Sequence, residues 1–314
     1  MKKIYLHMGS HKTGTTSIQS TLFNFKEELK EKNFEYFGGK KAHPNLYSAF
    51  KSDPMEFPWN RLSGLSKEDI IQRDQKSLKN IERKIKASEC ETLLFSSEFL
   101  SMLNPSEMQN LKGFFDQFGD VHAVYFYREL QSWISSDSQQ LSKVGFATRP
   151  TTFEVGIMRI FDFPMQIHNV FGADRTHFLK FEEMIAPQLT LNLLKQIGVD
   201  IGPEIDWQEI RENEAISGNA VHALFIYNRL FPLKSPHRNK KNVERLKNLP
   251  GEKYVSPRLT PAQINVYEEK RQEVKKALGL RLSKISSESE KTEGEILIPE
   301  ILKMINQFIR KNGL

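Results

Sequence analysis

A short run of glycine, lysine and threonine near the N-terminus carries residue types that bind anions. It reads Gly9-Ser-His-Lys-Thr-Gly-Thr-Thr16 and lies between an expected strand at 3–8 and an expected amphipathic helix at 15–31. In such a loop glycines let the backbone come close to a ligand, backbone N–H groups converge on anionic oxygens, and the helix N-terminus adds positive potential. Because a lysine and three threonines in one tight loop serve no packing purpose, we expect this loop to bind a phosphate-like group.

The loop departs from the pattern GxxxxGK[ST] of nucleoside-triphosphate-binding proteins. Gly9 and Gly14 have the right spacing, but Thr15 stands where the lysine belongs. The lysine of this loop, Lys12, comes two residues before the second glycine and has to approach a ligand from elsewhere in the loop. A P-loop small-molecule kinase or another ATP-binding protein remains the alternative function, and the displaced lysine counts against it.

A second candidate anion anchor follows the strand expected at 121–127. Arg128 comes directly after that strand, and Ser136 lies eight residues later. A guanidinium binds a phosphate through two parallel hydrogen bonds, and a serine about two helical turns on can add another. Ligands of α/β proteins bind at the carboxyl ends of the strands, so we expect Arg128 near the loop.

The two motifs together resemble a known enzyme family. Lys12-Thr-Gly-Thr-Thr16 after a strand resembles the 5′-phosphosulfate loop of the sulfotransferases, which use 3′-phosphoadenosine 5′-phosphosulfate (PAPS) as donor. The run from Leu6 to Gln19 looks most like the bacterial branch, and Arg128 with Ser136 matches the family's 3′-phosphate site. The resemblance is diffuse over about 1–280. It implies that PAPS is the co-substrate and that these residues bind it: Gly9, His11, Lys12, Thr13, Gly14, Thr15, Thr16, Arg128 and Ser136.

Sulfuryl transfer needs a cation near the leaving oxygen and a base for the acceptor's proton. Lys12 is the candidate cation, and two residues compete as the base. Glu98 follows an expected strand at 91–97 whose carboxyl end should lie beside the loop. His43 lies in a turn-rich segment where the family places acceptor-facing residues, and histidine has a convenient pKa. The alternatives are that Glu98 caps a helix or pairs with Lys12 or Arg128, and that His43 is a turn residue.

The sequence gives no sign of a metal or disulfide site. The PAPS sulfonate carries less charge than a terminal phosphate, so we expect no metal requirement. No carboxylate pair lies near the loop at metal-binding spacing, and no cluster of His, Cys and Asp appears. The single cysteine, Cys90, excludes an intramolecular disulfide and a cysteine-based zinc cluster.

The elements that must position these residues indicate an α/β protein. Strand-like runs alternate with helix-like runs up to about residue 210, as in a three-layer fold with a mainly parallel central sheet flanked by helices. Together with the loop, this pattern predicts a fold like that of the P-loop nucleoside-triphosphate hydrolases. Strands are expected at 3–8, 91–97, 121–127 and 176–181, and helices at 15–31, 66–88, 104–119, 152–170, 187–197, 217–230, 261–277 and 297–310. We expect one domain at 1–281, followed by a polar linker and a C-terminal helix within 282–314.

Composition bounds the partners and the location. Of 314 residues, 45 are Lys or Arg and 39 are Asp or Glu, a net charge of +6. No apolar run is long enough to span a bilayer, and no export signal follows the N-terminal lysines, so we expect a cytoplasmic protein with peripheral membrane contact left open. The basic stretch 234–253 either covers the nucleotide or is a solvated loop. Only this stretch and the pI suggest a nucleic-acid-binding module, and no known motif supports one.

The acceptor has no readable signature. Kinship with bacterial sulfotransferases implies a hydroxyl or amine on a small molecule or glycan, with a carbohydrate or glycolipid favoured. The expected acceptor loops at 33–65 and 138–152 contain no motif, and the oligomeric state is not predicted. Six aromatic residues either line a sugar-stacking surface or, as we prefer, belong to the core: Phe34, Tyr36, Phe37, Tyr47, Phe57 and Trp59.

Overall fold

The computed structural model describes residues 1–39, 44–210 and 215–285. These residues group into two compact units, the first from 1–128, 158–212 and 270–282, and the second from 129–157, 213–269 and the segment after 282. The helix expected at 297–310 and His43 lie outside the described residues. The single domain expected at 1–281 stays a prediction.

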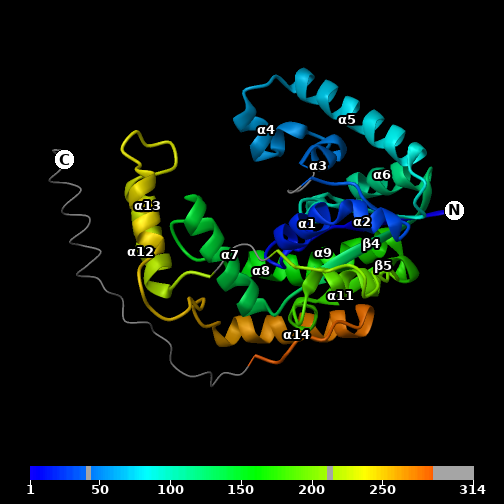
Figure 1. Ribbon diagram of the computed structural model, residues 1–314. Coiled ribbons are helices and arrows are strands. Elements are labelled where there is room, and N and C mark those ends of the chain that lie inside the picture. The colour runs from blue at the N-terminus through cyan, green and yellow to red at the C-terminus, as the bar shows by residue number, and fades with distance from the viewer. Residues whose placement is uncertain (40–43, 211–214, 286–314) are drawn as a thin grey trace. The chain divides into compact units, whose positions relative to one another are not determined.

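A parallel five-stranded sheet forms the centre of the first unit (Figure 1). Its spatial order is β2-β3-β1-β4-β5, and all four strand pairs are parallel. The strands are β1 (Lys2–His7), β2 (Phe34–Tyr36), β3 (Thr92–Ser96), β4 (Gly119–Tyr127) and β5 (Thr176–Lys180). Because β1 lies between β3 and β4, the residues that follow these three strands meet at one edge. The expected α/β fold with a parallel sheet is confirmed.

Helices cover both faces of this sheet. Successive strand side chains point to opposite faces, and Tyr5, Leu94 and Phe126 are buried on the face covered by α1 (Thr15–Asn24), α2 (Lys26–Glu31), α10 (Phe181–Met184) and α11 (Leu189–Gln196). The other face packs against α6 (Pro105–Asp116) and α9 (Phe163–Phe171), with the rings of Phe95 and Phe115 4.8 Å apart. Short 3-10 turns at Leu100–Met102 and Ala173–Arg175 complete the connections.

Two expected helices are interrupted. The helix expected at 15–31 breaks at Phe25, whose ring is buried and stacks on Trp207 at 4.6 Å. The helix expected at 152–170 consists of α8 (Phe153–Ile157), a π-helical turn at Met158–Asp162 and α9. Tertiary packing accounts for the break at Phe25, where no proline or glycine stands. At the second break Pro164 opens α9, and because it has no backbone N–H it cannot continue the hydrogen-bond ladder of the preceding helix.

Between β2 and β3 the chain forms a helical lobe, seen above the sheet in Figure 1. The lobe contains α3 (Pro44–Phe50), a 3-10 turn at Pro54–Glu56, α4 (Pro58–Ser63) and α5 (Lys67–Ala87). Its helices are joined by a buried polar network in which Arg73 Nη2 donates to Asn60 Oδ1 at 3.0 Å and to Asp74 Oδ1 at 2.7 Å. Ser48 also donates to Asp74.

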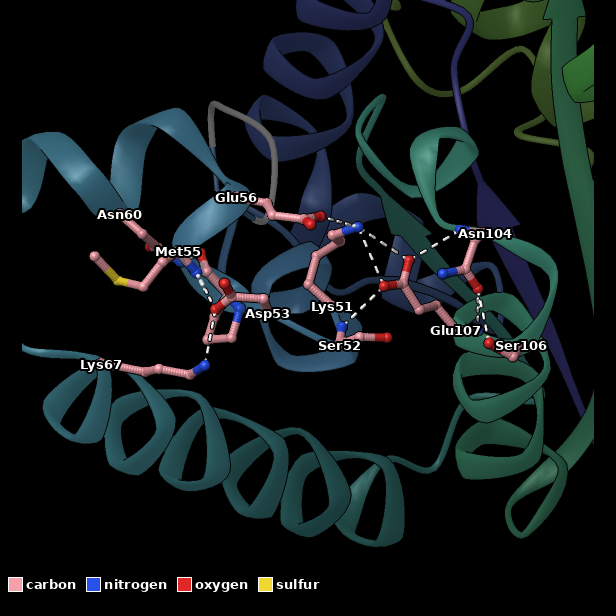
Figure 2. Close-up of polar contacts among 11 residues, drawn as sticks. Lys51, Ser52, Asp53, Met55, Glu56, Asn60, Lys67, Asn104, Ser106 and Glu107 are labelled. Atoms are coloured by element: carbon pink, nitrogen blue, oxygen red, sulfur yellow. Dashed lines mark hydrogen bonds and ion pairs between the residues drawn. The ribbon is translucent and has the colours of Figure 1, made fainter.

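A buried carboxylate anchors the lobe to α6 (Figure 2). Glu107, 1 % exposed, accepts hydrogen bonds from the backbone N–H groups of Ser52 at 2.8 Å and Asn104 at 2.9 Å. Lys51 Nζ lies 3.1 Å from the same carboxylate and 2.8 Å from Glu56. Burial alone raises the pKa of Glu107, but these hydrogen bonds outweigh it and hold the pKa below its usual value.

The regular secondary structure in the described residues of the second unit consists of helices and one isolated bridge between Ser217 and Lys253. It contains α7 (Leu130–Val144), α8, α12 (Gly218–Leu230) and α13 (Lys240–Lys247), and α12 packs against both α7 and α13. The last helix, α14 (Pro261–Leu278), runs from this unit into the first. None of the described helices has the length and hydropathy required to cross a membrane.

Candidate functional site

The glycine-containing loop connects β1 to α1 at the carboxyl edge of the sheet. Its backbone enters the left-handed region at Gly9 (φ 99°), Lys12 (φ 67°) and Gly14 (φ 75°). Glycine is favoured at position 14 because its φ is positive, and an added Cβ would also lie 2.3 Å from Leu189 Cδ2, which would have to move. A lysine in this region is uncommon and costs conformational energy, a type of strain that clusters at ligand-binding sites.

The three threonines of the loop have different roles. Thr13 and Thr15 are buried, and their hydroxyls donate to the carbonyl oxygen of Ser10 at 2.6 and 3.4 Å. These two threonines therefore hold the loop in shape. Thr16 is half-buried, and its hydroxyl forms no hydrogen bond with the part of the chain that the structure describes. Because α1 begins without a side-chain cap, Thr16 and the first backbone N–H groups of the helix are placed to bind an anion.

Arg128 follows β4 and reaches the same loop. Its Nη1 donates to the carbonyl oxygen of Lys12 at 2.8 Å, and its guanidinium lies over the ring of Phe181 at 4.9 Å. Its Nε lies 3.5 Å from Glu182 Oε1. Burial lowers the pKa of Arg128, and the charge of Glu182 opposes this shift. The structure thus brings together the two cations that the sequence analysis selected from positions 116 residues apart.

Ser136, the predicted partner of Arg128 at a 3′-phosphate, lies on α7 in the second unit. Its contribution to the site stays a prediction.

Glu98 approaches the loop from the neighbouring strand, β3. A Cβ added at Gly9 would lie 3.1 Å from the Cα of Glu98, so the two backbones pack closely. The Oε2 atom of Glu98 is buried and has no hydrogen-bond partner among the described residues. Burial raises the pKa of Glu98, while hydrogen bonds from its own backbone and from Gln19, and the charge of Lys12, limit the rise. Glu98 does not cap the next long helix, because Asn104 caps α6.

His11, within the loop, is held neutral. Its ring lies edge-on to Phe99 at 5.2 Å, and its Nδ1 lies 3.5 Å from Arg159 Nη1. Burial, reinforced by the charges of Arg159 and Lys12, lowers the pKa of His11 to about 3. The imidazole is therefore neutral near pH 7.

Arg159 lies beside the loop and is a further candidate residue that the sequence analysis did not select. It lies on the π-helical turn at Met158–Asp162, a type of helix irregularity frequent at functional sites. Its carbonyl oxygen accepts a hydrogen bond from the Tyr125 hydroxyl at 2.6 Å, and its guanidinium lies over the ring of Phe163 at 4.9 Å. No sequence motif marks it, because the surrounding residues have the pattern of an ordinary amphipathic helix.

A buried polar cluster lies beneath the loop and was also missed. His7 Nδ1 lies 2.8 Å from Ser96 Oγ, and Gln19 Nε2 donates to the same oxygen at 3.0 Å. Burial lowers the pKa of His7 to about 3, so the ring is neutral. The cluster joins β1, β3 and α1, and it fixes the elements that carry the loop and Glu98.

The remaining predicted site features are placed as follows. His43 lies outside the described residues. Of the six candidate sugar-stacking aromatics, five are at most 7 % exposed and belong to the core, whereas Trp59 is 54 % exposed. The rings of Tyr47 and Phe57 in the lobe pack against the ring of Phe99, with centroids 5.9 and 5.1 Å away. Phe99 also contacts the ring of His11. Within the described ranges, no three His, Cys, Asp or Glu side chains are grouped to hold a metal ion.

Comparison with known proteins finds distant structural neighbours only. No protein-family model and no curated protein matches this chain. A sulfotransferase from Alicyclobacillus acidocaldarius aligns at 15 % identity and a TM-score of 0.42, over 78 % of this chain and 100 % of the other. The sulfotransferase domain of the Synechococcus PCC 7002 olefin synthase aligns at 12 % identity and a TM-score of 0.39, over 79 % of this chain and 95 % of the other. The sulfotransferase domain of the curacin biosynthetic pathway aligns at 14 % identity and a TM-score of 0.42, over 90 % of this chain and 98 % of the other. Likeness this distant does not establish activity, which has to be inferred from the residues of the site.

Proposed function

We propose that this protein is a sulfotransferase that moves a sulfuryl group from PAPS to a hydroxyl or amine acceptor. The observation that carries the proposal is the convergence of Lys12, Arg128 and Glu98 on one loop at the ends of three adjacent strands. A kinase is less well supported, because position 15 holds a buried threonine bonded to the loop itself. The motif resemblance to sulfotransferases agrees with this reading.

In this proposal each residue around the loop has a separate role in the transfer. The acceptor oxygen attacks sulfur while the bond from sulfur to the bridging phosphate oxygen breaks, leaving negative charge on that oxygen. Lys12 supplies positive charge for the leaving oxygen, and the start of α1 with Thr16 holds the 5′-phosphate. Arg128, with Ser136, holds the 3′-phosphate. The donor keeps its place mainly through backbone N–H groups and these cations.

The acceptor's proton passes to Glu98 in this proposal. A carboxylate with a raised pKa is a better proton acceptor near neutral pH than an ordinary one, and Glu98 has a buried oxygen to which none of the described residues hydrogen-bonds. His43 remains the second candidate for the base. Nothing in this scheme requires a metal, so we expect turnover to survive a chelator.

The proposed acceptor is a carbohydrate or glycolipid, or another small hydroxyl- or amine-bearing molecule. The family resemblance alone supports this choice. Screening a panel of sugars with isotopically labelled PAPS would identify a working acceptor for the kinetic tests below.

Calorimetric titration tests the donor assignment without an acceptor. We expect adenosine 3′,5′-bisphosphate to bind and Mg-ATP to bind far more weakly, because Arg128 is assigned to the 3′-phosphate. Arg128→Ala should weaken bisphosphate binding at least tenfold, the loss of about one charge-assisted hydrogen bond. Lys76→Ala on the exposed side of α5 is the matched control and should bind like the wild type. Equal or tighter binding of Mg-ATP would reject the sulfotransferase proposal.

A further inference from the structure

The net positive charge of the chain is concentrated in one short segment of the second unit. Residues 229–247 contain seven Lys and Arg against a single acidic residue, Glu244. This segment alone carries a charge of +6, equal to that of the whole chain, so the remaining residues contain 38 basic and 38 acidic side chains. The segment spans the end of α12, the following loop and α13. Such a concentration generates a local field that the overall composition conceals.

Buried residues and hydrogen bonds pack the basic segment firmly against α12. The inner face of α13, Val243 and Leu246, is buried in a core with Leu224, Tyr227 and other residues of α12. Arg238 is part of this support, since its Nη1 donates to Asn228 Oδ1 at 3.0 Å and to the carbonyl of Phe231 at 2.8 Å.

Five of the basic residues instead face solvent. Among the described residues, these five have no acidic partner within ion-pair distance: Arg229, Lys234, Lys240, Lys241 and Arg245. The basic residues also crowd one another, because Lys247 contributes, after burial, to lowering the pKa of Lys143. A surface that only served solubility would be expected to mix charges of both signs.

Exposed apolar side chains lie within this basic segment and beside it. Leu230 and Leu233 are 48 % and 43 % exposed, and on the adjoining end of α7 Val144 and Phe146 are 38 % and 53 % exposed. The two stretches are in contact, because a Cβ added at Gly145 would lie 2.9 Å from Leu233 Cδ1.

Hydrogen bonds hold the same two stretches together. Asn228 Nδ2 donates to the carbonyl oxygen of Ala147 at 2.8 Å, and Arg229 Nη2 to that of Thr148 at 3.4 Å. We call the five solvent-facing basic residues and these four apolar residues the basic–apolar patch.

We propose that the basic–apolar patch docks this protein onto the surface of an anionic lipid bilayer. Exposed Leu and Phe side chains next to Lys and Arg fit an interface where apolar groups enter the acyl boundary and cations meet the lipid headgroups. A second copy of this chain is a poor occupant, because it would oppose one +6 segment with another. A nucleic acid would use the cations but leave the apolar side chains unexplained. The proposal does not depend on the enzymatic activity.

Vesicle flotation with the full chain tests the proposal directly. We expect binding to phosphatidylcholine vesicles that contain phosphatidylserine, little binding to phosphatidylcholine alone, and weaker binding as salt screens the charges. Absence of binding, or equal binding to both kinds of vesicle, would overturn the proposal.

Charge-removing variants locate the surface. Each Lys or Arg near an anionic surface strengthens binding about fivefold, so Lys234→Gln/Lys240→Gln/Lys241→Gln should weaken vesicle binding on the order of 100-fold. The control Lys76→Gln/Lys79→Gln/Arg83→Gln removes the same charge from the exposed side of α5 and should bind like the wild type. An equal loss in both variants would mean that total charge, and not this patch, governs binding.

Two further measurements separate the bilayer from other anions. Phe146→Ser/Leu233→Ser keeps every charge, and we expect it to lose roughly tenfold in vesicle affinity because two inserted side chains are removed. If it binds vesicles as the wild type does, and polyuridylate competes with vesicles for the wild type, the patch is a polyanion site. The triple glutamine variant should also retain its affinity for adenosine 3′,5′-bisphosphate. Loss of that affinity with unchanged vesicle binding would instead assign the segment to the nucleotide.

Discussion

Two glutamates of the first unit, Glu98 and Glu107, lie close to lysines in largely buried surroundings yet differ in nearly every other respect. Glu107 accepts two backbone N–H hydrogen bonds and an ion pair from Lys51, and its pKa is lowered (Figure 2). Glu98 has a buried oxygen without a partner among the described residues, and its pKa is raised despite the charge of Lys12. A neighbouring lysine therefore does not determine the behaviour of a carboxylate. The balance between burial, which raises the pKa, and the hydrogen-bond donors that reach the carboxylate, which lower it, does.

This difference separates a structural carboxylate from one suited to chemistry. Every donor around Glu107 stabilises its ionised form, so the group is already satisfied in the folded protein. Lys51 and Ser52 tie the end of α3 to α6, whereas the Asn104 N–H belongs to the N-cap of α6 itself. Glu98 keeps hydrogen-bonding capacity that residues 1–39, 44–210 and 215–285 do not use, at the edge where the loop and Arg128 meet. Unused capacity of a buried polar atom costs stability, which makes it a marker for a ligand or a reacting group.

The largest expected effect is on turnover. Glu98→Gln should lower turnover with the best acceptor of the sugar panel by about 10²–10⁴-fold, because amides do not accept a proton as a base does. Bisphosphate affinity measured by calorimetry should stay within about twofold of the wild type, since the role of Glu98 concerns the acceptor. Full turnover of Glu98→Gln would move the role of base to His43, and His43→Ala is the companion variant.

The next largest effect is on stability and concerns Glu107. Glu107→Ala should lower the free energy of unfolding by about 3 kcal/mol, because it leaves two backbone N–H groups without their acceptor and leaves Lys51 paired with Glu56 alone. Urea titration followed by circular dichroism measures the change. At temperatures where Glu107→Ala is folded, its bisphosphate affinity should equal that of the wild type. A stability equal to the wild type would show that the network of Figure 2 contributes little.

Sequence reasoning selected candidate residues that are marked by local patterns, and the structure places the loop and Arg128 in contact. The spacing of Gly9 and Gly14 and the strand before Arg128 were sufficient to place the two anchors, because parallel strands bring their carboxyl ends together. The strands β1, β3, β4 and β5 were found from their apolar and β-branched residues. The edge strand β2 was missed, since its three residues are too short to show a period.

The parts that were missed depend on contacts between distant residues. Arg159 reaches His11 across 148 positions, and the cluster of His7 and Ser96 joins two strands. The difference between Glu98 and Glu107 was also invisible, because each is a glutamate close to a helix start in the sequence. Burial and the hydrogen-bond donors around each side chain separate them, and both are properties of the fold.

A third carboxylate gives a smaller and opposite effect. Glu182 Oε1 lies 3.5 Å from Arg128 Nε, where it repels any phosphate that the guanidinium holds. Glu182→Gln should therefore strengthen bisphosphate binding about two- to fivefold, the size expected for a partly exposed ion pair. Glu183→Gln is the matched control, because Glu183 pairs with Arg281 and not with Arg128. Weaker binding in Glu182→Gln would mean that this carboxylate orients Arg128 for the phosphate.

The smallest effect concerns the pH dependence of folding stability, to which Glu98 and Glu107 contribute with opposite signs. The pKa of Glu107 is lowered in the folded protein, so its stabilising contribution is present above the ordinary glutamate pKa and is lost as pH falls through that range. The pKa of Glu98 is raised, so the folded protein takes up this proton first and gains stability relative to the unfolded chain as pH falls. Glu107→Gln should thus flatten the acid side of the stability curve.

Glu98→Gln should instead steepen the acid side of the stability curve. This variant should be slightly more stable than the wild type near neutral pH, and the difference should shrink toward pH values where Glu98 is protonated. Urea titrations of both variants over the acid range give the two slopes. Buried His7 and His11 destabilise the fold on acidification in both variants and in the wild type, so their contribution cancels from the differences. Slopes of the same sign would mean that Glu98 is as fully satisfied as Glu107, and it would then have no spare capacity for a proton.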